Sequence, residues 1–268
     1  MTAASCPQAF VTLAGEMAAA AGEVAHRYFR TRLDVQDKPD DTPVTLADRE
    51  AEARIREIIA DRYHDHGVIG EEGGSDRPEA EYVWVLDPID GTKKFVTGNP
   101  LFGTLIALLH EGRPILGLID MPMLGERWIG AAGRATRFED RQGAREVRVR
   151  PCAELAGAVL TATTPHMFGD AEFPAFERVR KAAKMVLYGG DCFAYGALAS
   201  GHLDLVVEAD MDPYDFMALV PVVEGAGGVI TDWKGGALGL ETDRRIIAAG
   251  DQRVHEAALE LLAGINSA

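Results

Sequence analysis

The sequence has few cysteines and no long apolar run, and each absence excludes a class of protein. Its three cysteines, Cys6, Cys152 and Cys192, are widely spaced and odd in number. This pattern excludes a disulfide framework and a Cys-x-x-Cys zinc site, and it favours reduced thiols. No apolar run reaches the ~20 residues that a membrane-spanning helix needs, and the N-terminus lacks the basic and apolar regions of a secretory signal. We therefore expect a cytoplasmic protein without a membrane segment.

Positive charge is also scarce. Lysine and arginine number 27 against 42 aspartates and glutamates, which gives a formal net charge of -15 at pH 7. This balance argues against nucleic acid or an anionic membrane as a partner. A small phosphorylated substrate remains compatible with it, because bound metal cations invert the local field.

The length and the alternation of patterns predict an α+β fold in layers. A chain of 268 residues is long enough to bury a large core, as one large domain or as two tightly packed halves. Residues 1–150 contain two amphipathic patterns, and we expect helices at 8–30 and 46–63 separated by a loop at 34–43. Several short strand patterns follow, which indicates an antiparallel sheet packed on these helices. The strands are expected at 82–86, 104–109, 115–121, 127–132 and 146–149, and residues 73–80 are expected to form a polar, flexible link.

From about residue 151 the rhythm changes to alternating strands and helices. We expect residues 151–268 to form a second, more α/β half that adds further ligands to the site of the first. Its strands are expected at 158–162, 185–188, 203–208, 228–232 and 245–249, and its helices at 173–183, 192–200, 214–225 and 254–263.

The most informative stretch begins with the apolar strand Tyr82–Leu86. It runs directly into D-P-I-D-G-T, which places Asp87 and Asp90 in one tight turn. Carboxylate and carbonyl oxygens are the ligands that Mg²⁺ prefers, and Mg²⁺ keeps water positions that a substrate phosphate can take. Pro88 stiffens the turn, and Gly91 lets backbone N–H groups approach an anion closely. With the upstream pair Glu71-Glu72, the pattern predicts a site for metal and phosphate.

Each acidic candidate also has a purely structural interpretation. Asp48 fits the third position of a capping box that begins at Thr45, and Asp215 fits the first turn of a helix that begins after Asp212. Asp191 fits a helix cap and Glu208 a surface charge at a strand end. For the D-P-I-D-G-T turn, the alternative is charge compensation by the following Lys93 and Lys94, and for Glu71-Glu72 it is a solvated loop.

Taken together, the motifs resemble the inositol monophosphatase-like family of Mg²⁺-dependent phosphatases, which has a layered α-β-α-β-α architecture. The resemblance spans residues 45–228 and rests on T-L-A-D at 45–48, G-E-E at 70–72, D-P-I-D-G-T at 87–92, P-Y-D at 213–215 and E-G-A-G-G at 224–228. Tyr214 stands where the family usually has tryptophan, and the aspartate that follows it is kept. The glycines at 225–228 lack the G-x-G-x-x-G order after a strand, so we do not expect a dinucleotide site.

The resemblance implies a role for each matching position. Glu71, Asp87 and the Ile89 carbonyl would hold a first Mg²⁺, and Asp87, Asp90 and Asp215 a second, with a looser third ion near Glu71 and Mn²⁺ as an alternative metal. Asp48 and Thr92 would orient and deprotonate the attacking water. Backbone N–H groups of Gly91 and Thr92 would bind the phosphate at a helix N-terminus. Water attack assisted by metal needs no covalent intermediate.

Within the family, the chain is most similar to the histidinol-phosphate phosphatases. The similarity lies in D-G-T-K-K-F at 90–95, G-N-P-L-F-G-T at 98–104 and the segment 188–208. The resemblance places Asp191 and Glu208 against the substrate, and two carboxylates suit the ammonium and imidazole of histidinol phosphate. An inositol-1-phosphatase, a phosphatase of sugar or nucleotide phosphates, and a non-catalytic metal-binding protein are the alternatives. The resemblance also implies a homodimer.

Overall fold

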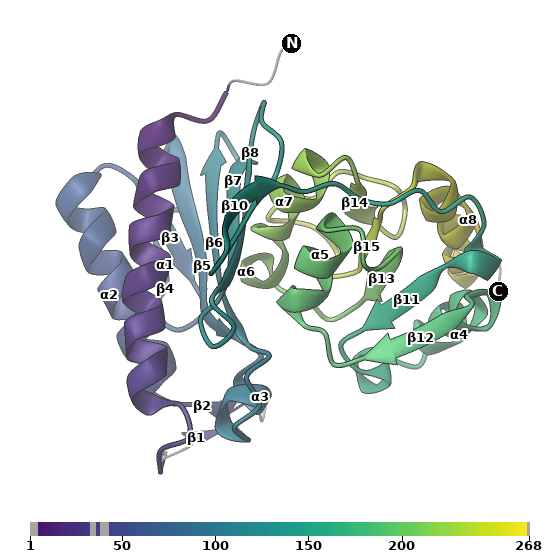
Figure 1. The fold of residues 1–268 in the computed structure, drawn as a ribbon, viewed down its shortest axis with the longest axis horizontal. Helices are drawn as coiled ribbons and strands as arrows, with labels where there is room; N and C mark the ends of the chain where they lie inside the picture. The colour runs from purple at the N-terminus through teal and green to yellow at the C-terminus, as the bar shows by residue number, and fades with distance from the viewer. Residues whose placement is uncertain (1–4, 33–35, 38–42, 267–268) are drawn as a thin grey trace.

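The computed structural model describes residues 5–32, 36–37 and 43–266, which form five layers (Figure 1). Helices α1 (Gln8–Tyr28) and α2 (Leu46–Arg62) cover one face of a large sheet. Helices α5 (Cys192–Ala199), α6 (Pro213–Phe216) and α7 (Leu219–Gly225) lie between that sheet and a second, smaller sheet. Helices α4 (Phe173–Ala182) and α8 (Gln252–Leu262) cover the outer face of the second sheet. The predicted α-β-α-β-α layering is therefore confirmed.

The large sheet has eight strands in the order β10-β9-β8-β7-β6-β5-β3-β4. All neighbours are antiparallel except β3 and β5, which run parallel. The strands are β3 (Gly67–Gly70), β4 (Gly74–Asp76), β5 (Tyr82–Asp90), β6 (Gly103–His110), β7 (Arg113–Met121), β8 (Glu126–Ala131), β9 (Arg137–Asp140) and β10 (Gly143–Glu146).

The two faces of this sheet bury different side chains, as the period of two along a strand requires. On β5, Trp84 and Leu86 pack with the buried faces of α1 and α2. Val83 and Val85 pack instead into the core between the two sheets, which also includes Val206 of the second sheet. The central strands therefore carry continuous apolar runs, because both of their faces are covered.

Strand β5 continues beyond its predicted end. It reaches Asp90, and its pairing with β6 shifts register between Asp87 and Asp90. Pro88 stands inside this irregularity, where a residue without a backbone N–H is tolerated. The bulge lets both aspartates leave the same strand end.

Two predictions for the large sheet are wrong. The strand expected at 146–149 is instead the end of the hairpin of β9 and β10, which turns at Arg141-Gln142 and ends at Glu146. The link expected at 73–80 contains β4, which pairs with β3. Both strands of that pair are short. Strand β4 is exposed along its length and carries no apolar pattern, and β3 has only Val68 and Ile69 between two glycines.

The loop predicted at 34–43 lies mostly outside the described residues. Within it, β1 (Gln36–Asp37) pairs antiparallel with β2 (Pro43–Val44).

The second sheet has the strand order β12-β11-β13-β15-β14. Strand β11 is parallel to β12 and β13, whereas β15 is antiparallel to β13 and β14. The strands are β11 (Val159–Ala162), β12 (Met185–Tyr188), β13 (Leu205–Glu208), β14 (Val229–Asp232) and β15 (Ile246–Ala249). Short 3₁₀ turns lie at Leu155–Gly157, Pro165–Met167 and Ala263–Asn266.

The helix predicted at 214–225 is divided into α6 and α7. Pro221 explains the division, because inside one continuous helix its ring would clash with the carbonyl of Met217. When α7 begins at Leu219, Pro221 falls in the first turn, where its missing N–H has no partner to lose.

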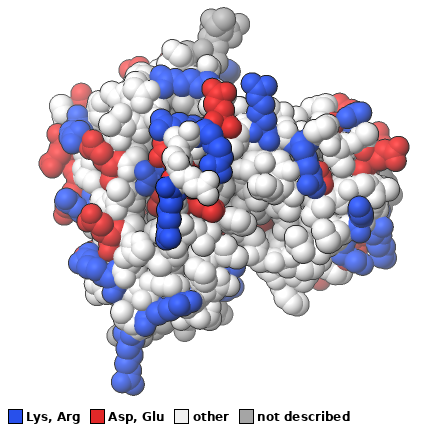
Figure 2. All heavy atoms as spheres, in the orientation of Figure 1, with Lys and Arg blue, Asp and Glu red and all other residues white. Residues whose placement is uncertain are grey.

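Within the described part of the chain, none of the helices combines the length and apolarity needed to cross a membrane. Over the α1 and α2 layer, at the left of Figure 2, acidic and basic side chains are interspersed. Ion pairs such as Arg62–Glu16 and Arg27–Glu50 contribute to this mixture.

Candidate active site

Three predicted metal ligands meet at one point between the sheets. Carboxylate oxygens of Asp87, Asp90 and Asp215 all lie within 4.8 Å of one another. The first two leave the bulged end of β5, and the third belongs to the single-turn helix α6. At the end of β5, Gly91 adopts φ +86°, a left-handed conformation that reverses the chain into helix α3 (Thr92–Val96).

These carboxylates repel one another, and their environment disfavours the charged form. Burial, and then the charges of Glu71, Asp90 and Asp215, raises the pKa of Asp87 well above its usual value. Burial also raises the pKa of Asp90, to about 7, with the charge of Asp191 as the next cause. The pKa of Asp215 is raised well above normal by burial and by the charge of Asp90. Bringing these groups together as anions is costly unless a cation compensates them.

The lysines after the turn do not supply that compensation, so this alternative interpretation is wrong. Lys94 pairs with Asp191. Among the ion pairs of the described residues, neither Lys93 nor Lys94 contacts Asp87 or Asp90. A set of hard oxygen donors with mutual repulsion and no basic partner fits a divalent cation such as Mg²⁺.

Asp48 serves as a capping residue and also faces the site. Its Oδ2 accepts hydrogen bonds from the Thr45 backbone N–H at 2.8 Å and from the Thr45 hydroxyl at 2.5 Å, which completes the predicted capping box. Its Oδ1 lies 3.3 Å from the hydroxyl of Thr92, which also lies 3.2 Å from the Ile89 carbonyl oxygen. Burial raises the pKa of Asp48. Asp48 is therefore the capping residue of the structural interpretation, and the catalytic role that its contact with Thr92 allows stays a prediction.

Asp215 has the same double placement. Its Oδ2 accepts from the Asp212 backbone N–H at 2.7 Å, and Pro213 occupies the first position of α6. The predicted capping contact thus orients the carboxylate that joins Asp87 and Asp90.

Glu208 is not the surface charge that its position at a strand end allowed. Its side chain is buried. One carboxylate oxygen accepts from the backbone N–H and the hydroxyl of Thr163, at 2.8 and 2.6 Å, and the other accepts from the Tyr195 hydroxyl at 2.8 Å. Burial raises the pKa of Glu208, and these hydrogen bonds oppose the rise. A carboxylate has about four acceptor positions, so one remains for a ligand.

Asp191 does not cap α5 with its side chain, so that interpretation is also wrong. Its carboxylate points back across the site, where its Oδ2 forms an ion pair with Lys94. It also lies 2.9 Å from the point that a Cβ at Gly91 would occupy. The backbone of Asp191 has φ +43°, a conformation that costs a non-glycine residue on the order of 1–3 kcal/mol.

A cavity of about 520 Å³ brings these groups together. Its lining includes Asp90 and Asp215 of the acidic cluster, the start of α3, the turn after β11 and the end of β13. Among the residues that line it are Glu71, Asp90, Gly91, Thr92, Lys93, Lys94, Thr163, His166, Gly189, Asp191, Tyr195, Glu208 and Asp215. The structure therefore places the predicted substrate contacts in the same cavity as Glu71, Asp90 and Asp215, three of the predicted metal ligands, and adds exposed His166 to its lining.

The sequence interpretation missed the residue that fixes the Glu71 loop. Glu52 of α2 is buried, and its carboxylate accepts from the backbone N–H groups of Glu72 and Gly73, each at 2.8 Å. Arg56 donates to the same carboxylate at 2.7 Å and also to the Gly74 carbonyl. The available signal was an acidic residue on the apolar face of a predicted helix, four positions before an arginine.

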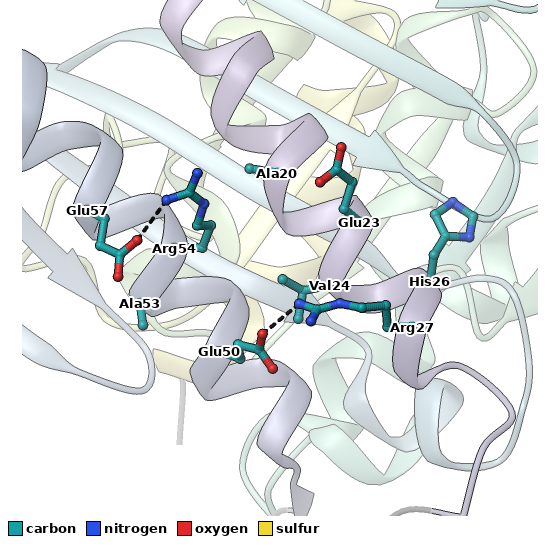
Figure 3. Close-up of a pocket in the computed structure, with 9 residues that line it drawn as sticks. All are labelled: Ala20, Glu23, Val24, His26, Arg27, Glu50, Ala53, Arg54 and Glu57. Atoms are coloured by element: carbon teal, nitrogen blue, oxygen red, sulfur yellow. Dashed lines mark hydrogen bonds and ion pairs between the residues drawn. The ribbon is translucent and has the colours of Figure 1, made fainter.

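A second hollow lies on the opposite side of the large sheet, between α1 and α2 (Figure 3). Its volume is about 790 Å³, and none of the predicted site residues lines it. Two ion pairs extend across its wall, Arg27–Glu50 and Arg54–Glu57. These charges neutralise each other and are exposed, so they offer no convergent set of ligands.

The five layers and the acidic centre define one class of protein, and the comparisons give its family. The model of the inositol monophosphatase family matches residues 7–267, and the chain belongs to this family of phosphatases. The bifunctional phosphatase IMPL2, chloroplastic, of Arabidopsis thaliana is 49% identical over 94% of this chain and 75% of its own length. A histidinol-phosphatase of Chlorobaculum parvum is 38% identical over 83% of this chain and 85% of its own.

The fold comparison agrees. The structure of an inositol monophosphatase from Zymomonas mobilis has a TM-score of 0.87 and 41% sequence identity, and the match covers 96% of this chain and 98% of that one.

Proposed function

We propose that this chain is a Mg²⁺-dependent phosphomonoesterase that hydrolyses L-histidinol phosphate to L-histidinol and phosphate. The observation that carries the proposal is one cavity with two acidic regions. The first is Asp90 with Asp215, which line the cavity and cluster with the buried Asp87, and it suits metal and phosphate. The second is Asp191 with Glu208, which suits a cationic alcohol. The three free cysteines support a reducing, cytoplasmic location, which fractionation of cells with an antibody to the chain would check.

The metal would be held by residues that the structure brings close together. Asp87, Asp90 and Asp215 would bind one ion, and Glu71, Asp87 and the Ile89 carbonyl another, with two or three ions in all and Mn²⁺ as a substitute. Bound Mg²⁺ supplies Lewis acidity and neutralises charge at the phosphate.

Side chains of the chain itself supply the remaining steps. Thr92 accepts a hydrogen bond from the attacking water while its own hydroxyl proton points to Asp48 Oδ1, 3.3 Å away. Asp48 then receives a proton through this contact, and its raised pKa makes it a better base than an exposed aspartate. The backbone N–H groups of Gly91 and Thr92 orient the phosphate beside the ligands of the metal.

The choice of substrate rests on charge and on the names of relatives. The relative from Chlorobaculum parvum is called a histidinol-phosphatase, and the Arabidopsis relative is called bifunctional. The alternative is an inositol-1-phosphatase or a phosphatase of broad specificity, and the similarity to the inositol monophosphatase of Zymomonas mobilis favours it. A non-catalytic metal-binding protein is disfavoured, because Asp48 and Thr92 are both present and in contact.

Variants of the two buried carboxylates test the substrate. We expect Asp191→Asn and Glu208→Gln to raise KM for histidinol phosphate by about tenfold or more, since each removes a charged acceptor from the ammonium or the imidazole. The KM for inositol-1-phosphate, whose alcohol has no positive charge, should change much less. Steady-state phosphate release with both esters gives the comparison. Equal increases for the two esters would mean that neither carboxylate recognises the substrate's positive charge.

We also propose a homodimer through the edge of the second sheet. The edge strand β12 exposes 48% of Met185, 46% of Leu187 and 45% of Tyr188, and Phe173 of the neighbouring α4 is 40% exposed. An apolar edge strand is a liability in a monomer and a common interface in a symmetric dimer.

Light scattering tests this interface. We expect the wild type to have twice the mass of one chain and Leu187→Asp to have the mass of a monomer. Leu46→Asp changes a leucine on α2 that is more exposed than Leu187, and it should leave the dimer intact. A monomeric wild type at micromolar concentration would refute the interface.

A further inference from the structure

One contact in the cavity involves a residue to which neither the motifs nor the proposed mechanism assigns a role. Lys94 Nζ donates to the Gly189 carbonyl at 2.6 Å and forms an ion pair with Asp191 Oδ2. Both side chains are nearly enclosed, with 15% of Lys94 and 8% of Asp191 exposed. The cavity therefore already contains a primary ammonium bound by a carboxylate and a carbonyl.

The position of this ammonium group is well defined. The backbone of Asp191 is held at φ +43°, and its carboxylate lies over Gly91, where a Cβ would come within 2.9 Å of Oδ2. Next to it, the Cys192 backbone N–H donates to Asp90 Oδ2 at 2.8 Å. The bound lysine ammonium is thus held by a residue whose neighbour in the chain contacts Asp90, in the cavity that Glu208 also lines.

We propose that Lys94 is a specificity-determining residue that holds Asp191 in the free protein and is displaced by the ammonium of a cationic substrate. The Asp191 carboxylate and the Gly189 carbonyl both accept hydrogen bonds from the Lys94 ammonium. A primary ammonium on the substrate would offer the same N–H donors. An ester with an uncharged alcohol has no ammonium to replace that of Lys94, so Lys94 stays paired with Asp191. The inference rests on the proposed function, and it adds a competition between two ammonium groups for one carboxylate.

The competition makes the effect of removing Lys94 opposite for the two kinds of ester. In Lys94→Met, Asp191 is free to bind the substrate's ammonium without displacing a lysine, so a cationic ester gains. For an uncharged ester, the unpaired carboxylate adds repulsion toward the phosphate, so this ester gains nothing or loses. If Lys94 instead binds the phosphate directly, its removal weakens both esters alike.

The test measures kcat/KM for histidinol phosphate divided by kcat/KM for inositol-1-phosphate. We expect Lys94→Met to raise this ratio roughly three- to tenfold, the range that a partly enclosed ion pair allows. Lys93→Met is the matched control, because Lys93 also lines the cavity but forms none of the ion pairs found among the described residues. It should leave the ratio within about twofold, since it removes the same charge without releasing Asp191.

A double variant assigns the effect to Asp191. In the Asp191→Asn background, Lys94→Met should leave the ratio unchanged, because the carboxylate for which the two ammonium groups compete is absent. A rise in that background, or equal losses for both esters in Lys94→Met alone, would overturn the inference. Lys94→Gln keeps a donor for the Gly189 carbonyl and provides the same test if the methionine variant does not fold.

The substrate and the role of Lys94 can fail separately. A wild-type ratio of one or below would refute the choice of histidinol phosphate. A high wild-type ratio that Lys94→Met leaves unchanged would refute only the role of Lys94.

Discussion

Asp90→Asn is expected to reduce kcat by at least about 10³-fold while leaving the fold intact. The substitution keeps the shape of the side chain, and an amide oxygen still accepts from the Cys192 backbone N–H. It removes one negative charge from the cluster with Asp87 and Asp215. Asp61→Asn makes the same chemical change on the exposed surface of α2 and should have no effect on kcat. An active Asp90→Asn enzyme would refute the metal assignment.

Thermal unfolding gives this prediction a readout other than turnover. Excess Mg²⁺ at about 100 times its Kd stabilises a single site by about 2.7 kcal/mol, which corresponds to a rise in Tm of roughly 5–10 °C for a chain of this size. Asp90→Asn should lose most of this rise. Without metal it should be as stable as the wild type or more stable, because it removes a charge that repels Asp87 and Asp215.

The pH dependence has a definite sign. The pKa of Asp90 is raised to about 7 from the 3.8 of an ordinary aspartate, so the folded state binds the proton more tightly than the unfolded state. Its contribution to stability is therefore fully present below the unfolded value and is lost as pH rises toward 7. Above pH 7, the metal-free wild type should have its lowest free energy of unfolding relative to that of Asp90→Asn. Stabilisation by Mg²⁺ should be largest there, because protons no longer compete for the ligand.

Asp48→Asn is expected to lower kcat by about 10²- to 10⁴-fold with little change in KM. The amide cannot take a proton from Thr92, although its oxygen can still accept from the Thr45 backbone N–H. The prediction separates the catalytic role of Asp48 from its role in the capping box. Rates measured at saturating substrate and Mg²⁺ would test it.

Thr45→Ala is the matched control for the capping role. It removes the hydroxyl that donates to Asp48 and accepts from the Ala47 backbone N–H, and it should cost about 1 kcal/mol of stability. It keeps Asp48 beside Thr92, so kcat should stay within about tenfold of the wild type. If Asp48→Asn retains kcat while Thr45→Ala destabilises the fold, Asp48 is only a cap.

Local patterns were sufficient to predict most of the fold. The apolar periodicity of α1 and α2, and the turn residues between β6, β7 and β8, define elements without knowledge of their partners. The prediction failed where a partner decides the structure. Strands β3 and β4 are short and partly glycine, and β3 is fixed by parallel pairing with β5. Pro221 was a local signal for the break between α6 and α7 that the periodicity of the segment obscured.

The candidate site follows the same division. The bulged end of β5 concentrates Asp87 and Asp90 within four residues, so the sequence alone indicated a cluster that also includes Asp215 in the structure. The contact between Lys94 and the Gly189 carbonyl joins residues 95 positions apart, and no local pattern indicates it. Glu52 was hidden for a related reason, since its partners are backbone N–H groups about 20 residues away.

The most direct test of the proposed function is phosphate release by the purified full chain with Mg²⁺, from histidinol phosphate and inositol-1-phosphate side by side. We expect release that stops on chelation of the metal, with a clear preference in kcat/KM for histidinol phosphate. Comparable rates, or a preference for the inositol ester, would contradict the proposed substrate. Release of phosphate from neither ester would contradict the proposed function itself.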